Sequence, residues 1–149
     1  MTDLWLAIVH HVLVFGLAIM LAVQATLLRE GMSPEDASRL ARLDIGYGAS
    51  AGLIVVVGIL RVIYGAKGYV YYVDNVWFWA KMATFGAIGI LSVPPTLRFR
   101  AWQSARKMNA AFMPPVEEIR RLRTYLRWEL RLLIGVVAFA ATMARYTSL

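Results

Sequence analysis

The chain has 149 residues, of which 60% are hydrophobic, and its mean hydropathy is +0.59. These values exceed those of an ordinary soluble protein, and the length suits one domain spanning residues 1–149. The net charge is +7, but the basic residues lie at the ends of apolar segments, so we expect them to set membrane topology and expect no nucleic-acid partner. Cysteine is absent, which excludes disulfides, thiolate metal ligands and covalent haem attachment.

Four segments are long and apolar enough to cross a bilayer, which takes about 20 helical residues. The first, residues 4–28, is uncharged. It lacks the basic start and the small-residue cleavage site of a signal peptide, so we expect it to be retained. The others cover residues 43–64, 76–98 and 116–146. The sequence therefore predicts an all-α integral membrane protein, a four-helix transmembrane bundle with the lipid bilayer around it.

The ends of these helices carry recognisable signals. Ser33 suits a helix cap and Pro34 suits a first helical position, so we expect the second helix to begin before it enters the membrane. Pro114 and Pro115 give a similar start to the fourth helix. The pair Pro94–Pro95 lacks two amide donors and is expected to kink or end the third helix.

The basic residues are distributed unevenly between the connections. Eleven of the 16 follow the first or the third apolar segment, namely Arg29, Arg39, Arg42, Arg98, Arg100, Arg106, Lys107, Arg120, Arg121, Arg123 and Arg127. By the positive-inside rule these connections are cytoplasmic. We therefore predict a multi-pass protein with both termini extracytoplasmic.

Several basic groups lie inside the apolar segments, where a charge costs roughly 2.5–3.5 kcal/mol. His10 and Lys81 each lie about five or six residues from the outward start of their helix, which is roughly 8–9 Å deep. Arg61 and Arg145 reach the same leaflet from the ends of the second and fourth segments. All four helices are thus expected to bring a basic group to one level.

Helical phase indicates which of these groups face inward. His10 and Gln24 lie about 40° apart around the first helix, whereas His11 lies about 140° from Gln24. Lys81 and Ser92 lie about 20° apart on the third helix. We expect His10, Gln24, Lys81 and Ser92 to face the interior.

Other polar and small residues have a simpler interpretation. Glu129 and Arg131 lie near the cytoplasmic end of the fourth segment, where snorkelling accounts for a charge. Gly48 and Gly52 form the G-x-x-x-G spacing that lets two membrane helices approach closely. We expect this pair to support contact between copies of the chain.

Adjacent histidines in a membrane helix can serve as hydrogen-bonding groups at the level of the lipid headgroups. They can also bind metal, because neutral imidazole is a common axial ligand of haem iron. On this interpretation His10 or His11 holds the iron. Arg61, Lys67, Lys81 and Arg145 then neutralise the two propionates.

The chain resembles an uncharacterised family of small four-helix bacterial inner-membrane proteins, which implies that location. The likeness is carried by His10–His11, by Asp44 with Tyr47–Gly48, by residues 58–68, by residues 78–82 and by residues 92–96. The family supplies no activity.

A more distant likeness is to the membrane-bound, haem-containing protoporphyrinogen oxidase family, which pairs a first-helix His with a Lys in a W-x-x-K-L-like motif. His10 and Lys81 fill these positions, the latter within residues 77–82. Copper-resistance membrane proteins have a similar helical layout. The resemblance implies haem b, but the double His and residues 61–68 depart from the pattern.

The leading hypothesis is a small membrane protein that binds haem b and has a redox role, as a possible membrane oxidoreductase. Lys81 and Arg61 would then act on a porphyrin or quinone-like substrate, or hold the propionates. One alternative is a small transporter or metal-handling protein. Another is a non-enzymatic assembly subunit of a membrane complex.

Overall fold

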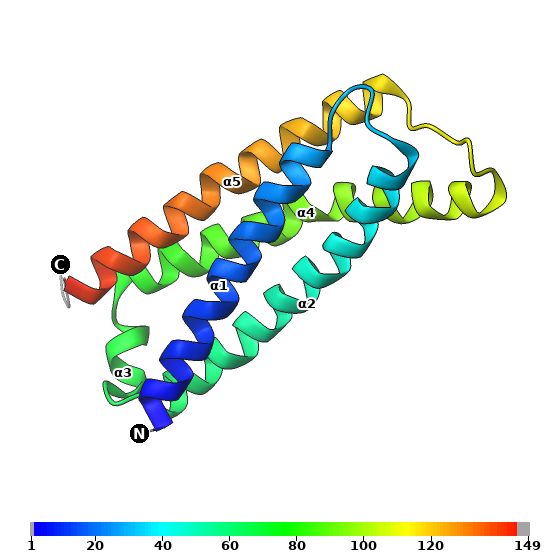
Figure 1. Cartoon of the computed structure of the whole chain (residues 1–149). Coiled ribbons are helices and arrows are strands. Elements are labelled where there is room, and N and C mark those ends of the chain that lie inside the picture. The colour runs from blue at the N-terminus through cyan, green and yellow to red at the C-terminus, as the bar shows by residue number, and fades with distance from the viewer. Residues whose placement is uncertain (1, 146–149) are drawn as a thin grey trace.

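The computed structural model describes residues 2–145 and, within them, shows five helices and no strands (Figure 1). They are α1 (Thr2–Leu27), α2 (Pro34–Tyr64), α3 (Gly68–Val73), α4 (Val76–Met108) and α5 (Val116–Arg145). The all-helical prediction is confirmed, but the predicted number of four helices is wrong. The extra helix, α3, has six residues, too few to give a periodic pattern. Residue 146, the predicted end of the last helix, lies outside the described residues.

Among the described residues, three helices are long and apolar enough to cross a membrane. They are Asp3–Leu27, Pro34–Tyr64 and Val76–Met108. Helix α5 is not one of them, because acidic and basic residues crowd its first half. The membrane character predicted from composition is therefore supported for α1, α2 and α4.

Helix α2 begins at Pro34, as its capping signal predicts. The Asp36 amide donates to the Ser33 hydroxyl at 3.3 Å, and the Ser33 amide donates to the Asp36 carboxylate at 3.2 Å. This reciprocal capping box extends α2 well before residue 43, where the apolar segment starts. Helix α5 begins at Val116, directly after the Pro114–Pro115 pair that predicts its start.

Helix α4 does not end at its proline pair but continues to Met108. Pro94 and Pro95 each remove one amide donor from the helix, which costs stability locally. The part after the prolines is held by tertiary packing, because Phe99 and Trp102 are 0% and 3% exposed. The predicted end near residue 98 was wrong because burial of this face outweighs the lost hydrogen bonds.

The four long helices form a ring in the order α1, α2, α4, α5. Neighbours in this order pack against each other, with α1 against α2 and α4 against α5 most extensively. The pairs α1–α4 and α2–α5 lie diagonally across the ring. Figure 1 shows α3 and the two chain termini at one end, which we call the terminal end. The opposite end, the loop end, holds the α1–α2 and α4–α5 connections.

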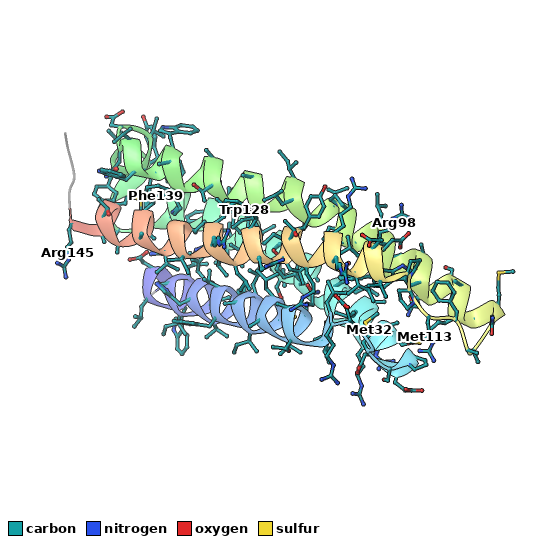
Figure 2. All side chains as sticks on the ribbon, turned by 90° about the horizontal axis from the view of Figure 1, so that it is seen from above. Met32, Arg98, Met113, Trp128, Phe139 and Arg145 are labelled. Atoms are coloured by element: carbon teal, nitrogen blue, oxygen red, sulfur yellow. The ribbon has the colours of Figure 1, made fainter. Side chains whose placement is uncertain are left out.

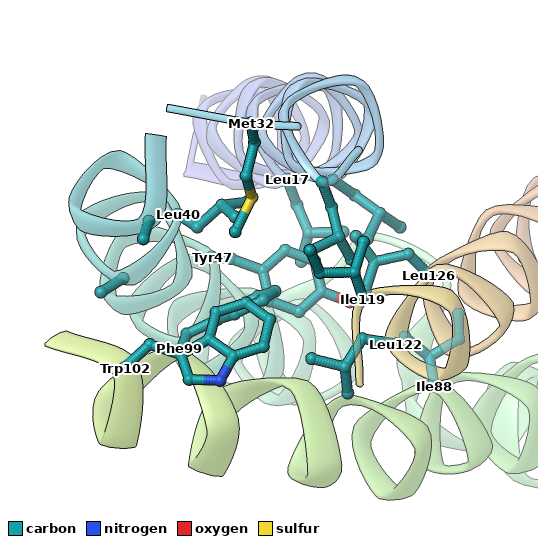
Figure 3. Packing of buried hydrophobic residues seen from close by; sticks show 14 of the residues in the cluster. Leu17, Met32, Leu40, Tyr47, Ile88, Phe99, Trp102, Ile119, Leu122 and Leu126 are labelled. Carbon is teal, nitrogen blue, oxygen red and sulfur yellow. The ribbon is translucent and has the colours of Figure 1, made fainter. Parts of the chain in front are cut away.

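The core lies along the axis of this ring and is densest toward the loop end. Figure 3 shows Leu17, Tyr47, Phe99 and Leu126 converging from the four long helices. The outward faces are also apolar, and they include Phe15, Ile90 and Ile134 at 67%, 74% and 71% exposed. Apolar side chains on both faces are what helices surrounded by lipid require.

The G-x-x-x-G pair lies on the outer surface of α2. Gly48 and Gly52 are exposed, and a Cβ atom built on either would meet nothing within 4 Å. These glycines therefore do not mediate helix packing within the chain. Contact between copies at this position stays a prediction.

Candidate functional site

A cavity of about 330 Å³ lies among the long helices in the half nearer the terminal end. Three basic side chains line it, each from a different helix: His10 of α1, Arg61 of α2 and Lys81 of α4. Helix α5 contributes the apolar residues Leu133, Val136 and Met143. The lining contains no acidic side chain among the residues that the structure describes. The cavity is therefore apolar on most of its surface and positively charged on the rest.

Two of the three basic side chains in the cavity have a buried nitrogen without a hydrogen-bond partner among the described residues. The buried Nδ1 of His10 and the buried Nε of Arg61 have no hydrogen-bond partner within residues 2–145. The Lys81 ammonium lies 5.2 Å from the centroid of the Phe78 ring, a cation–π contact. Buried polar atoms are normally satisfied, so these orphaned nitrogens are available to a ligand.

The cavity is closed toward the terminal end by α3. Tyr72 of α3 is 7% exposed and lines the cavity. Its neighbour Tyr71 donates a hydrogen bond to the Met143 carbonyl of α5 at 2.6 Å and accepts one from Lys67 at 2.9 Å. The hydrogen bond of Tyr71 and the burial of Tyr72 thus hold α3 in place as a short cover over the cavity.

The cavity opens sideways between α2 and α4. Val55, Ile59 and Ile63 of α2 and Met82 of α4 belong to its lining and are also 38–59% exposed. All four are apolar, so the opening faces the region that lipid would occupy. A largely apolar ligand could enter by this route without crossing a polar surface.

Three predicted site residues lie outside the cavity. His11 is exposed on the outer side of α1, where its Nδ1–H donates to the Ala7 carbonyl at 2.6 Å. Arg145 is exposed at the end of α5, beyond Phe139 (Figure 2). Lys67 does not line the cavity and donates to the Tyr71 hydroxyl.

Helix α5 therefore supplies only apolar groups to the cavity, and Arg145 does not join His10, Arg61 and Lys81 there. Ser92 does not line the cavity either, and its hydroxyl donates to the Gly89 carbonyl of its own helix.

A second group of polar residues lies buried beyond the floor of the cavity, toward the loop end. Glu129 is 1% exposed and Asp44 is 5% exposed, whereas Arg131 is exposed over the Trp128 ring at 4.8 Å. The snorkelling interpretation therefore fits Arg131 and is wrong for Glu129. The burial of Glu129 could have been predicted from its spacing. Glu129 lies seven residues, or about two helical turns, after Leu122, and therefore on the same buried face of α5.

Comparison with known proteins supports one of the two resemblances and gives no support to the other. One protein-family model, described as "Predicted membrane protein (DUF2214)", matches residues 2–147. No curated protein and no solved structure gives a significant match. The likeness to haem-containing oxidases and to copper-resistance proteins thus gains no support, whereas that to an uncharacterised membrane family does. Because the matched region spans nearly the whole sequence, the chain belongs to the family described as "Predicted membrane protein (DUF2214)".

Proposed function

We propose that this protein binds haem b in the cavity, with His10 as the residue that would hold the iron, and that it has a redox role in the bacterial inner membrane. The observation that carries the proposal is the convergence of His10, Arg61 and Lys81 on one apolar cavity. An imidazole can bind haem iron and two cations can pair with its two propionates, and this cavity offers both kinds of group.

The size and the unsatisfied groups of the cavity support this assignment. Its volume of about 330 Å³ lies within the usual range of ligand pockets. Because the cavity opens between α2 and α4, one edge of a porphyrin ring that is larger than the cavity could extend toward the lipid. Binding would also satisfy the orphaned nitrogens of His10 and Arg61.

The charge of the cavity argues against the alternative that it handles bare metal ions. Arg61 and Lys81 both lie close enough to His10 to act on it electrostatically, and they would repel a free metal cation. Within residues 2–145 no group of three or more His, Asp or Glu side chains could hold a metal. Iron within an anionic porphyrin avoids the repulsion because the propionates meet the cations.

Haem would supply one-electron chemistry, and the chain's own residues would bind and orient it. His10 would hold the iron, Lys81 and Arg61 would hold carboxylates, and Tyr72 would exclude water at the terminal end. We further propose that α5 also crosses the membrane, which gives a four-helix transmembrane bundle with both termini extracytoplasmic. The 11 basic residues at the loop end support this orientation.

Absorption spectroscopy of the purified protein tests the proposal. Expression with sufficient haem should yield a protein with a Soret band, and acid acetone should extract the haem because the chain has no cysteine to attach it. His10→Ala should abolish or greatly reduce the band. His11→Ala is the matched control, because His11 lies outside the cavity, and it should keep most of the band.

A folded but colourless protein from haem-replete cells would overturn the haem assignment. Retention of the Soret band in His10→Ala together with its loss in His11→Ala would reject His10 as the ligand.

A further inference from the structure

The centre of the helix ring contains a carboxylate held by a tyrosine. The Tyr47 hydroxyl of α2 donates to Glu129 Oε2 of α5 at 2.9 Å. The two residues are 4% and 1% exposed. Since α2 and α5 lie diagonally opposite, this hydrogen bond crosses the middle of the molecule and Glu129 points into its interior.

Two buried polar atoms in the core have no protein partner among the described residues. One is the other oxygen of Glu129, Oε1, which has no hydrogen bond. The other is Nε2 of Gln24 on α1, whose residue is 2% exposed. Each orphaned atom carries a desolvation cost unless something satisfies it.

Gln24 and Glu129 each interrupt a stripe of buried leucines. The first stripe, on α1 and the residue after it, is Leu17, Leu21, Gln24 and Leu28, and the second, on α5, is Leu122, Leu126, Glu129 and Leu133. In each stripe one polar residue stands among three buried leucines at helical spacing. Figure 3 shows Leu17, Tyr47 and Leu126 meeting in the core from α1, α2 and α5.

Glu129 lies close to the floor of the cavity. Leu133, one helical turn farther along α5 toward the terminal end, lines the cavity, so about 6 Å of helix separates Glu129 from that floor.

Among residues 2–145, no basic side chain forms an ion pair with Glu129 or with the neighbouring Asp44. The Asp44 carboxylate of α2 is buried and accepts a hydrogen bond from Thr96 of α4 at 3.0 Å. The charge of Arg100 on α4 acts on Asp44 without an ion pair, and Arg131 of α5 is exposed at the surface.

An ionised carboxylate at such a place is costly, and a bound cation would relieve the cost. The described residues contain no group of three or more acidic or histidine side chains that could hold a metal ion. A proton needs only one oxygen. With Oε2 occupied by Tyr47, the unpaired Oε1 is the oxygen that would carry it.

We propose that Glu129 is an exchangeable proton-binding site at the centre of the molecule, with Tyr47 as its positioning residue. The site lies between the loop end and the floor of the cavity, so a proton held there is a short distance from a ligand in the cavity. The proposal does not depend on the identity of that ligand.

Infrared spectroscopy of the purified full-length protein in lipid tests this proposal. A protonated carboxylic acid has a carbonyl stretching band separate from the carboxylate bands. The expected result is a band that shifts in deuterated water, decreases as the pH rises, and is lost in Glu129→Gln, which keeps the shape and removes the acid. Glu117→Gln at the exposed start of α5 is the matched control and should leave the band unchanged.

A second variant tests the role of Tyr47. A hydrogen bond donated to a carboxylate favours its ionised form, so in Tyr47→Phe the band should persist to higher pH. A band that is unchanged by Tyr47→Phe would reject Tyr47 as a positioning residue.

Three results would overturn the proposal as a whole. They are the absence of the band at every pH, a band that does not decrease even at alkaline pH, and loss of the band on addition of sodium chloride but not choline chloride. The last would show that a metal cation, and not a proton, occupies Glu129. None of these results depends on whether haem is present, so this test and the Soret test fail independently.

Discussion

The Thr96 hydroxyl donates a hydrogen bond to the Asp44 carboxylate at 3.0 Å, and this contact joins α4 to α2. The residues are 52 positions apart, and Thr96 follows directly after the proline pair of α4. Because Asp44 is 5% exposed and has no ion pair among the described residues, this hydrogen bond is a main source of its stabilisation.

Thr96→Val should therefore lower the free energy of unfolding by about 1–3 kcal/mol, because it leaves a buried carboxylate without its donor. Denaturation in detergent followed by circular dichroism measures the change. Thr142→Val is the control, since the Thr142 hydroxyl bonds only to the Ala138 carbonyl of its own helix. Equal stability of the two variants would show that the Thr96–Asp44 contact contributes nothing.

Lys81→Met should weaken haem binding by about 10- to 100-fold, because a hydrogen bond to a charged group contributes about 1.5–3 kcal/mol. Titration of haem into the detergent-solubilised protein measures this. The same substitution should raise the melting temperature of the ligand-free protein, because it removes a cation that lies beside Arg61. Lys107→Met, at the exposed loop end of α4 and away from the cavity, should not change haem affinity, and an unchanged affinity in Lys81→Met would exclude Lys81 from the site.

Reporter fusions test the proposed orientation. Alkaline phosphatase fused after residue 149 should be active in a bacterial host, because the C-terminus is expected outside the cytoplasm. The same enzyme fused after residue 110, in the α4–α5 connection, should be inactive, while a green fluorescent protein at that point should fluoresce. The reverse pattern would place the terminal end, and the cavity with it, on the cytoplasmic side.

The ion pair between Glu30 and Arg120 predicts a pH dependence at the loop end. Arg120 Nε lies 2.9 Å from Glu30 Oε1, and this hydrogen bond and the positive charge lower the pKa of Glu30 below its usual value of 4.5. A lowered pKa in the folded state gives stability that is present above the unfolded pKa and is lost as the pH falls through the folded pKa. Arg120→Gln should thus lower the melting temperature slightly at neutral pH, and the difference should vanish in acid.

High salt should reduce the same difference, because both side chains of this pair are exposed to solvent. Arg39→Gln, which removes an ion pair within α2, provides a comparison that does not involve Glu30. A difference between Arg120→Gln and the unsubstituted protein that persists below the pKa of Glu30 would show that Arg120 acts by packing.

The helical class, the membrane character and the starts of α2 and α5 could be predicted from local features of the chain. These properties depend on local composition, hydropathy and capping residues such as Ser33 and Pro34, which act over a few positions. Helical phase also assigned His10 and Lys81 correctly to the interior, because each lies on a regular helix whose faces can be counted.

Only the tertiary structure decided which polar groups meet. The positions of His11 and Arg145 outside the cavity depend on how α1 and α5 rotate against their neighbours, and charge and depth alone do not encode that rotation. The continuation of α4 through Pro94 and Pro95 likewise depends on burial against other helices. Glu129 is the clearest case. Its position in the sequence suits the exposed end of a membrane helix, but in the structure it is buried and accepts a hydrogen bond from Tyr47 of the opposite helix.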